Sequence, residues 1–296
     1  MCLSETKDCD HASWAEFRRL TGWSVLSCSR ARELSPSGGF TSVSGGVAVI
    51  NCSPHYLTIR ELAADSRGLL SVDVSCPQSS FSPILVSVMY LAPAGSPFQS
   101  LNDAVISSLS SVLDKAEPQY NGEVLVLGDF NVRMGPKDPA GNPRATADAT
   151  RQLSSCKLLL PCLRSHALAP LMGRAPESPA PCTSRSISGV RQGRAEVDYI
   201  CGRDDLDPQR YTVLPVESWR SLPKAMTHLG IGIEYLPLPT TAQHILSSLQ
   251  RPGRRWKDPV YCDRDSWAKV ANCIQEELKN VLPTLYSFRC KFRDMN

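Results

Sequence analysis

The chain lacks several features that would place it quickly in a functional class. Its 296 residues include 12 cysteines, but no two of them are spaced as Cys-x-x-Cys, so neither a zinc ribbon nor a thioredoxin-type site is indicated. No apolar run approaches the roughly 20 residues that cross a bilayer. The stretch Met1–Asp10 also lacks the apolar core of a signal peptide. We therefore expect a nuclear or cytoplasmic protein with free thiols and no membrane partner.

A strong charge of one sign is also lacking. The formal net charge of +3 is too small to indicate nucleic-acid binding by itself. Basic residues do gather late in the chain, within 251–257 and 289–293. A solvated linker and tail is the simpler interpretation of these clusters, and weak attraction to a phosphate backbone is the other. No internal repeat is visible.

What the sequence does contain is a short apolar run, 124–127, that leads into Gly-Asp-Phe-Asn. The run predicts a buried strand, and Gly128 would let another backbone or a substrate come close because it has no Cβ. Asp129 and Asn131 point to the same face if the extended geometry persists. A carboxylate that orients or deprotonates water, beside an amide that binds a phosphoryl oxygen, suits phosphodiester cleavage. The alternative is a local Asx turn that caps the strand.

The surrounding pattern favours a layered α/β domain, because short apolar strands alternate with helical patterns. Apolar spacing predicts a helix over 101–113 and a shorter one around Trp14, Phe17 and Leu20. Regions 136–144 and 175–194, rich in Pro, Gly, Ser and Arg, predict surface loops. The predicted strands are Val47–Ile50, Ile84–Tyr90, Val124–Leu127, Val197–Ile200, Tyr211–Val216 and Ile231–Leu236.

Composition divides the chain into three parts. Residues 1–239 form the predicted main domain, and 240–262 form a basic linker. Residues 263–296 form a C-terminal helix and tail, with Asp263 as N-cap and an apolar stripe that begins at Trp267.

Four more polar residues are candidates for a site with Asp129 and Asn131. Glu5, within Ser-Glu-Thr, could bind a hard cation such as Mg²⁺, although an exposed acid is the simpler interpretation. Tyr90 ends a strand, and its hydroxyl could donate to phosphate or simply lie at the surface. Asp198 sits in an apolar strand and calls for a partner, for which His228 is the natural choice. A single His at a strand start is more often structural than catalytic.

The motifs in this order resemble the endonuclease/exonuclease/phosphatase superfamily, and within it the apurinic-type endonuclease domain of non-LTR retrotransposons. The resemblance covers about the first 240 residues and is most specific at Gly-Asp-Phe-Asn and Asp-Tyr-Ile. The segment around Trp256 and the helix after it resemble the connector that precedes a reverse transcriptase in such elements. The matching residues are Ser4-Glu5-Thr6, Gly45 to Val49, Tyr90, Gly128 to Asn131, Asp198-Tyr199-Ile200 and His228.

The resemblance implies two mixed β-sheets packed face to face with flanking helices, and a C-terminal helix beyond them. It also implies roles for single residues: Glu5 would bind Mg²⁺ or Mn²⁺, and Asp129 would position the attacking water. Asn131 and Tyr90 would contact the phosphate, and His228, held by Asp198, would stabilise the developing charge. DNA is the implied partner, through its phosphate backbone.

Two departures from the family pattern bear on activity. The family's first strand, with its Asn, would precede Glu5, so we expect a sheet that is one strand short. Thr227 replaces an aspartate that helps hold the metal, and a neutral hydroxyl is a weaker ligand for a hard cation. The sequence thus leaves three interpretations: a DNA-nicking enzyme of impaired activity, a catalytically inactive relic with weak nucleic-acid binding, and a phosphatase acting on a small phosphoester.

Overall fold

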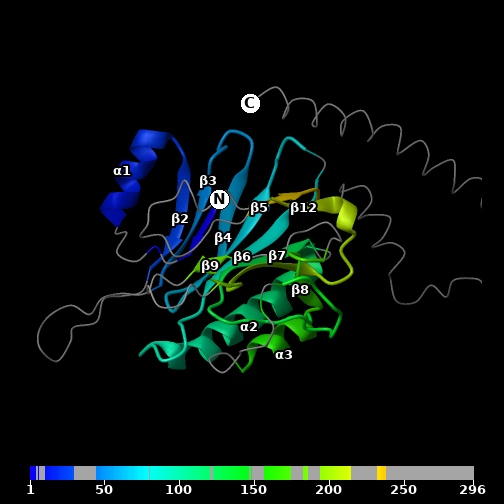
Figure 1. Cartoon of the computed structure of the whole chain (residues 1–296). Coiled ribbons are helices and arrows are strands. Elements are labelled where there is room, and N and C mark those ends of the chain that lie inside the picture. Colours follow the sequence, from blue (N-terminus) through cyan, green and yellow to red (C-terminus); the bar gives the residue numbers. More distant parts are fainter. Residues whose placement is uncertain are drawn as a thin grey trace, which may run out of the picture. The chain divides into compact units, whose positions relative to one another are not determined.

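The structure of the protein is a computed structural model. The residues that it describes are 1–4, 6, 11–29, 45–79, 81–120, 123–146, 148, 157–174, 183–185, 194–214 and 232–237. All of them belong to one compact unit, Met1–Ile245 (Figure 1). The second unit, Leu246–Asn296, lies outside the described residues, and with it the predicted C-terminal helix and tail. The predicted linker 240–262 lies outside them as well.

A six-stranded mixed sheet forms the framework of the described unit, with the order β4-β5-β6-β7-β11-β8. Strands β6 and β7 pair in parallel, whereas the other neighbours pair antiparallel. The parallel pair follows from its connection, because helix α2 (Asn102–Tyr120) returns the chain along the sheet between the two strands. The strands are β4 Thr58–Asp65, β5 Leu69–Ser75, β6 Ile84–Tyr90, β7 Val124–Asp129, β8 Leu168–Pro170 and β11 Asp198–Arg203.

A smaller sheet of three strands lies over the first. Its order is β1-β3-β2, with β1 at Cys2–Ser4, β2 at Ser24–Cys28 and β3 at Val47–Asn51. Strand β1 contacts β6 and β7, and β3 contacts β5 and β6. The larger sheet is mixed, as predicted, whereas the described strands of the smaller sheet all pair antiparallel.

Two short antiparallel ribbons and the remaining helices complete the described elements. One ribbon pairs β9 (Ser184–Arg185) with β10 (Arg194–Ala195), and the other pairs β12 (Tyr211–Leu214) with β13 (Gly232–Tyr235). The other helices are α1 His11–Thr21, α3 Leu159–Ser165, and the 3-10 helices η1 Gln99–Leu101 and η2 Pro208–Arg210. Each strand predicted from the sequence overlaps an observed strand, with bounds that differ by a few residues.

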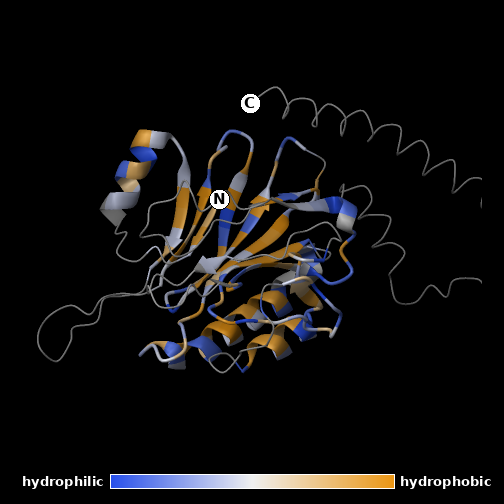
Figure 2. Ribbon diagram, in the orientation of Figure 1, coloured by the Kyte–Doolittle hydropathy of each residue, from blue (hydrophilic) through white to orange (hydrophobic). Residues whose placement is uncertain are grey.

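The strands of the six-stranded sheet are rich in apolar residues (Figure 2), and core clusters form on both of its faces. Alternation along β6 sends Val86 and Val88 towards the smaller sheet, where they pack with Val47. Leu85 and Met89 point the other way, into a core that includes the buried face of α2. The described unit therefore has four layers: α1, the three-stranded sheet, the six-stranded sheet, and α2 with α3 (Figure 1). This is the predicted arrangement of two sheets face to face with helices outside.

Helix α2 forms where the sequence predicts it and extends beyond that stretch, to Tyr120. Val105, Leu109 and Leu113 recur at helical spacing and are completely buried against the six-stranded sheet. Burial of this stripe stabilises the helix more than its composition does, because four serines lower its intrinsic propensity.

Helix α1 covers the outer face of the three-stranded sheet. Trp14 packs there with Val25 and Ile50, and Phe17 is partly buried beside it. The helix predicted around Trp14, Phe17 and Leu20 is present, but Leu20 does not take part in this packing, since its side chain is 68% exposed. At 3.6 residues per turn, Leu20 lies about 120° around the helix from Trp14 and faces away from the sheet.

Strands β4 and β5 escaped the sequence prediction. Strand β4 is the edge of the six-stranded sheet and is mostly exposed, so it carries no alternating apolar pattern. Strand β5 is buried over its first half and includes Ser71, whose hydroxyl lies 2.8 Å from that of Ser87 on β6. Both serines are fully buried, so each hydroxyl satisfies the other inside the core.

The described residues bear on two expectations from the sequence, which concern membrane-spanning segments and the state of the cysteines. None of the described helices combines the length and apolar character needed to cross a membrane. The cysteines within the described stretches are free thiols: Cys2, Cys28, Cys52, Cys76, Cys162 and Cys201.

Candidate active site

Three of the predicted site residues stand in one row across three neighbouring strands. Tyr90, the last residue of β6, is the register partner of Asp129, the last residue of β7. Asp129 is in turn the partner of Asp198, the first residue of β11. Register partners project their side chains from the same face of a sheet. The row therefore brings a phenol and two carboxylates together at one edge of the sheet.

This row faces the smaller sheet. Tyr90 belongs to the core between the two sheets, as does Leu127, which shares the face of Asp129. Tyr90 and Asp129 are almost completely buried, and Asp198 is half-buried. A buried carboxylate is costly unless hydrogen bonds compensate for its lost hydration.

Asn131 supplies these hydrogen bonds to Asp129. Its backbone N–H donates to Asp129 Oδ1 at 2.9 Å, and its side-chain Nδ2 donates to Asp129 Oδ2 at 2.9 Å. Nδ2 also donates to the carbonyl of Leu91, at 2.8 Å. The chain turns here, with φ +49° at Asn131, so the extended geometry ends at Asp129. The Asx turn considered from the sequence is thus formed, and it holds the carboxylate in place.

Gly128 allows the close approach that its sequence position suggested, and the approaching group is the backbone of β6. A Cβ on Gly128 would lie 2.0 Å from the carbonyl oxygen of Met89, its register partner. The residue also has φ +136°, a backbone conformation that residues other than glycine rarely adopt. Glycine therefore brings the ends of β6 and β7 together just before Asp129.

Asn102 braces the segment that follows Tyr90, and the sequence analysis missed it. Its buried amide accepts from the N–H of Ala92 at 2.8 Å and donates to the carbonyl of Ala92 at 2.9 Å. Together with the bond from Asn131 to Leu91, this clamp fixes the chain directly after Tyr90. The sequence signal was weak, because an Asn before an apolar helix is an ordinary N-cap.

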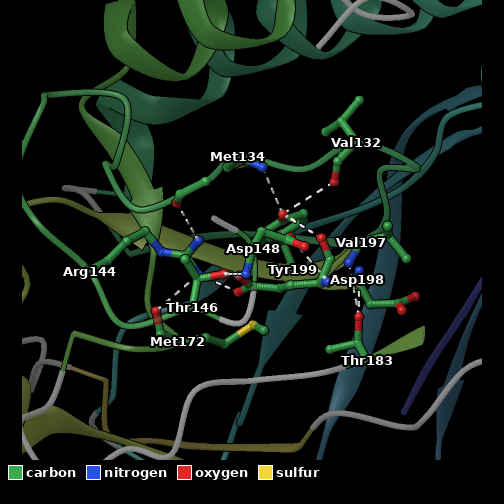
Figure 3. Close-up of polar contacts among 12 residues, drawn as sticks. Val132, Met134, Arg144, Thr146, Asp148, Met172, Thr183, Val197, Asp198 and Tyr199 are labelled. Atoms are coloured by element: carbon green, nitrogen blue, oxygen red, sulfur yellow. Dashed lines mark hydrogen bonds and ion pairs between the residues drawn. The ribbon is translucent and has the colours of Figure 1, made fainter. Parts of the chain in front are cut away.

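Thr183 is a second residue that the sequence analysis missed. It is fully buried, and its hydroxyl oxygen accepts from the N–H groups of Val197 at 3.0 Å and Asp198 at 3.1 Å (Figure 3). The hydroxyl therefore fixes the backbone at the start of β11. A lone Thr within a Ser- and Arg-rich stretch gives no signal of this contact.

A buried ion pair lies beside the same segment. Arg144 and Glu196 contact each other with both side chains fully buried, and Thr146 Oγ1 donates to Glu196 Oε2 at 2.6 Å. The guanidinium of Arg144 also stacks over the ring of Tyr199, 5.8 Å from its centroid. The surface loop predicted for 136–144 thus reaches the surface in part only, because its last residue, Arg144, turns inward to meet Glu196.

Burial changes the acidity of this cluster. It raises the pKa of Glu196 and of Asp148, although Arg144 opposes the shift at both carboxyls. Burial also raises the pKa of Tyr199 well above its usual value, so its hydroxyl stays protonated and can donate to the carbonyl of Glu196, at 2.7 Å.

Comparison with solved structures reveals a similar overall fold in known proteins. The chain is similar to the 3'-5' exonuclease NExo from Neisseria meningitidis, with a TM-score of 0.54 and 17% identity over 79% of this chain and 88% of the other. It is also similar to the 3' phosphatase NExo from Neisseria bound to a product DNA hairpin, with a TM-score of 0.53 and 15% identity over 79% and 87%. This chain has the endonuclease/exonuclease/phosphatase fold.

Sequence comparison adds nothing to this result, since no family model and no curated protein matches the chain. The endonuclease domain of TRAS1, a telomere-specific non-LTR retrotransposon, matches with a TM-score of 0.46 and 14% identity over 80% of this chain and 98% of that domain. At these identities the likeness concerns the endonuclease/exonuclease/phosphatase fold itself.

Two of the predicted site residues, Glu5 and His228, lie outside the described residues, as does Thr227. The described neighbours of Glu5 are fixed by β3: Ser4 pairs with Val47, and the N–H of Thr6 donates to the carbonyl of Gly46 at 3.2 Å. Strand β1, which ends at Ser4, contacts β6 and β7, the strands that carry Tyr90 and Asp129.

Within the described part of the chain, no group of three or more His, Cys, Asp or Glu side chains could hold a metal ion. The row Tyr90–Asp129–Asp198 lies at one edge of the described sheet. Carboxylate and amide oxygens, which this edge offers at Asp129, Asn131 and Asp198, are the donors that a hard cation such as Mg²⁺ prefers.

Proposed function

We propose that this chain is a Mg²⁺-dependent phosphodiester hydrolase that nicks DNA. The single observation that carries the proposal is the register row Tyr90–Asp129–Asp198 at the end of three adjacent strands. A structural role alone would not require two acidic side chains in adjacent register positions, where like charges oppose each other. A site that handles phosphate, water and a cation does require such groups.

The residues of the row would divide the chemistry among them. The carboxylate of Asp129, held by the two donors of Asn131, would accept a proton from the attacking water or orient it. The hydroxyl of Tyr90 would donate to a phosphoryl oxygen. Asp198 would orient His228, whose imidazolium would balance the charge that develops on the phosphoryl group.

The contact of Asn131 with phosphate remains a prediction and has a geometric condition. Both hydrogens of its Nδ2 already serve Leu91 and Asp129. A phosphoryl oxygen would therefore have to replace one of these two acceptors. Orientation of Asp129 is the role that this geometry supports directly.

The residues at this edge fit a divalent cation bound through oxygen. Glu5 would hold it, with the carboxylate of Asp129 close to the same edge, and Mn²⁺ could take its place. Such a cation lowers the pKa of a bound water and polarises the phosphoryl group.

DNA as substrate and an origin in a retrotransposon are part of the same proposal. They rest on the order of the sequence motifs and on the connector-like segment around Trp256. The basic residues within 251–257 would add attraction to the phosphate backbone that weakens as salt rises.

Nicking of supercoiled plasmid in Mg²⁺ tests the proposal. We expect the wild-type protein to convert plasmid to the open circle, and Asp129→Ala to slow this at least about 100-fold, because a general base is lost. Asp205→Ala is the matched control, since Asp205 is a 72% exposed carboxylate just beyond β11. If wild type and an Asp129→Ala/His228→Ala double variant nick equally little, the chain is an inactive relic instead.

Two further measurements separate the remaining alternatives. Release of phosphate from nucleotide or inositol esters without plasmid nicking would identify a phosphatase acting on small phosphoesters. Thr227→Asp should raise Mg²⁺-dependent nicking by restoring a carboxylate ligand. Unchanged nicking in that variant would show that the Thr227 position does not limit the activity.

A further inference from the structure

The buried pair of Arg144 and Glu196 holds a long loop against the strand that begins at Asp198. The guanidinium donates to Glu196 and also to the carbonyl oxygens of Gly135 at 3.2 Å and Met172 at 3.4 Å (Figure 3). The Arg144 side chain thus attaches Glu196 to a loop that starts immediately after Asn131. Since both partners are fully buried, neither charge can be satisfied by water if the other is removed.

The loop is fixed at two more points around the same strand. The hydroxyl of Tyr199 accepts from the N–H of Met134 at 3.0 Å, and Asp148 Oδ2 accepts from the N–H of Glu196 at 3.2 Å. The N–H of Ala145 donates to the carbonyl of Gly173 at 3.0 Å. The loop therefore doubles back and packs as a brace on the start of β11.

The brace holds the chain beyond the point where the pairing of β7 with β11 ends. The register of β7 with β11 begins at Asp129 and Asp198, and no further pairing of the two strands is described beyond that row. Just beyond it, the N–H of Phe130 donates to the carbonyl of Val197 at 2.9 Å. Glu196 is bonded through its N–H, its carbonyl and its carboxylate, each time to a side chain, so this residue is fixed independently of the sheet ladder.

We infer that the Arg144–Glu196 pair is a positioning device for Asp198 in the proposed hydrolysis. The inference rests on the proposed function. Glu196 lies two residues before Asp198, so a shift of the Glu196 backbone is transmitted through Val197 to Asp198. Displacement of a catalytic group by about 1 Å can slow a reaction about 100-fold. Glu196 and Arg144 do not touch the row itself and act through the backbone.

Steady-state nicking kinetics with the full chain test the inference. Glu196→Gln keeps the shape of the side chain but removes its charge, and we expect kcat to fall 10-fold or more with KM unchanged. Leu109→Ala is the control for lost stability, because Leu109 on α2 is buried on the face of the six-stranded sheet that points away from the row Tyr90–Asp129–Asp198. That variant should keep the wild-type kcat when assayed well below its own melting temperature.

A milder variant covers the case in which Glu196→Gln does not fold. Thr146→Val removes only the hydroxyl that donates to Glu196 Oε2, and we expect a smaller fall in kcat in the same direction. A wild-type kcat in every folded variant of Glu196 and Thr146 would overturn the inference. If kcat falls as much in Leu109→Ala as in Glu196→Gln, the inference is also overturned, because a general loss of stability would then explain both results.

The outcomes for the two proposals differ. If wild type nicks, Asp129→Ala does not, and Glu196→Gln matches wild type, only the positioning role is lost. If wild type nicks no better than Asp129→Ala, the proposed function fails and the positioning role fails with it.

Discussion

Gly128 is a position that tolerates no side chain, for two independent reasons. Its φ of +136° is strained for any other residue, and a Cβ would meet the Met89 carbonyl at 2.0 Å. We expect Gly128→Ala to lower the free energy of unfolding by about 3 kcal/mol or more, or to prevent folding. Urea denaturation followed by circular dichroism measures the change.

Gly95→Ala separates strain from steric clash. Gly95 also has a positive φ, +81°, but an added Cβ would meet nothing within 4 Å. We expect Gly95→Ala to lower the free energy of unfolding by about 1 kcal/mol, from backbone strain alone. Similar losses in the two variants would show that the close approach of β6 and β7 contributes nothing.

Single residues differ in how well the sequence predicts them. Asp129 and Tyr90 end apolar strands, so their place at a sheet edge follows from periodicity, and the structure then joins them with Asp198 in one row. Arg144 could not be found in this way. It ends a stretch with the composition of a surface loop, and only the partner 52 residues away, Glu196, explains its burial.

At the scale of elements, the turn between β4 and β5 makes stability depend on pH. Arg67, and to a lesser extent Ser108 on α2, lower the pKa of Asp65 to about 2 from 3.8. The ionised form stabilises the fold, so this contribution is complete above about pH 4 and is lost as the pH falls through about 2.

We expect this contribution to be small, below about 1 kcal/mol, because Arg67 is 43% exposed and water screens the pair. Asp65→Asn should abolish it. The measurement is the free energy of unfolding of both proteins between pH 2 and pH 6, and parallel curves for the two would contradict the assignment to Asp65.

Helix α2 holds the far face of the six-stranded sheet through its apolar stripe. We expect Leu109→Ala to cost about 3 kcal/mol of unfolding free energy, since the side chain is fully buried and its removal leaves a cavity. Leu20→Ala on the exposed face of α1 is the matched control and should change stability by no more than about 0.5 kcal/mol. Equal effects at the two sites would disprove the packing described for α2.

Elements were predictable where burial leaves a clear apolar pattern. Strands β6 and β7 are buried on both faces and form nearly continuous apolar runs, whereas helix α2 carries one apolar stripe, and all three were predicted. Strand β4 was not, because it lies at the edge of a sheet and its residues resemble those of an exposed helix. The layer order followed from the family resemblance, since periodicity alone does not say which sheet covers which.

For the molecule as a whole, a buried cluster joins distant parts of the chain at the start of β7. Arg210 donates to both carboxylate oxygens of Glu123, at 2.8 and 2.9 Å, and the hydroxyl of Tyr235 on β13 donates to Glu123 at 2.6 Å. These contacts attach the β12–β13 ribbon to the six-stranded sheet. They span 87 and 112 residues of sequence.

We expect Arg210→Met to lower the free energy of unfolding by about 3 kcal/mol, because it leaves the Glu123 carboxylate buried without its cation. Adding Glu123→Gln to that variant should restore part of the loss. A double-mutant cycle from thermal denaturation gives the coupling, and purely additive effects would show that the two residues do not depend on each other.

The buried hydroxyl pair of Ser71 and Ser87 has a consequence for how the sheet chooses its alignment. A slip of β5 by two residues would keep its apolar face inward but would set Ser71 against Leu85 or Met89. Two hydroxyls would then be stranded in an apolar core, at a cost of about 1–3 kcal/mol each. The pair therefore favours the observed register of β5 with β6, and that register sets the β4–β5 turn beside Tyr90, whose N–H donates to the carbonyl of Gly68 at 2.9 Å.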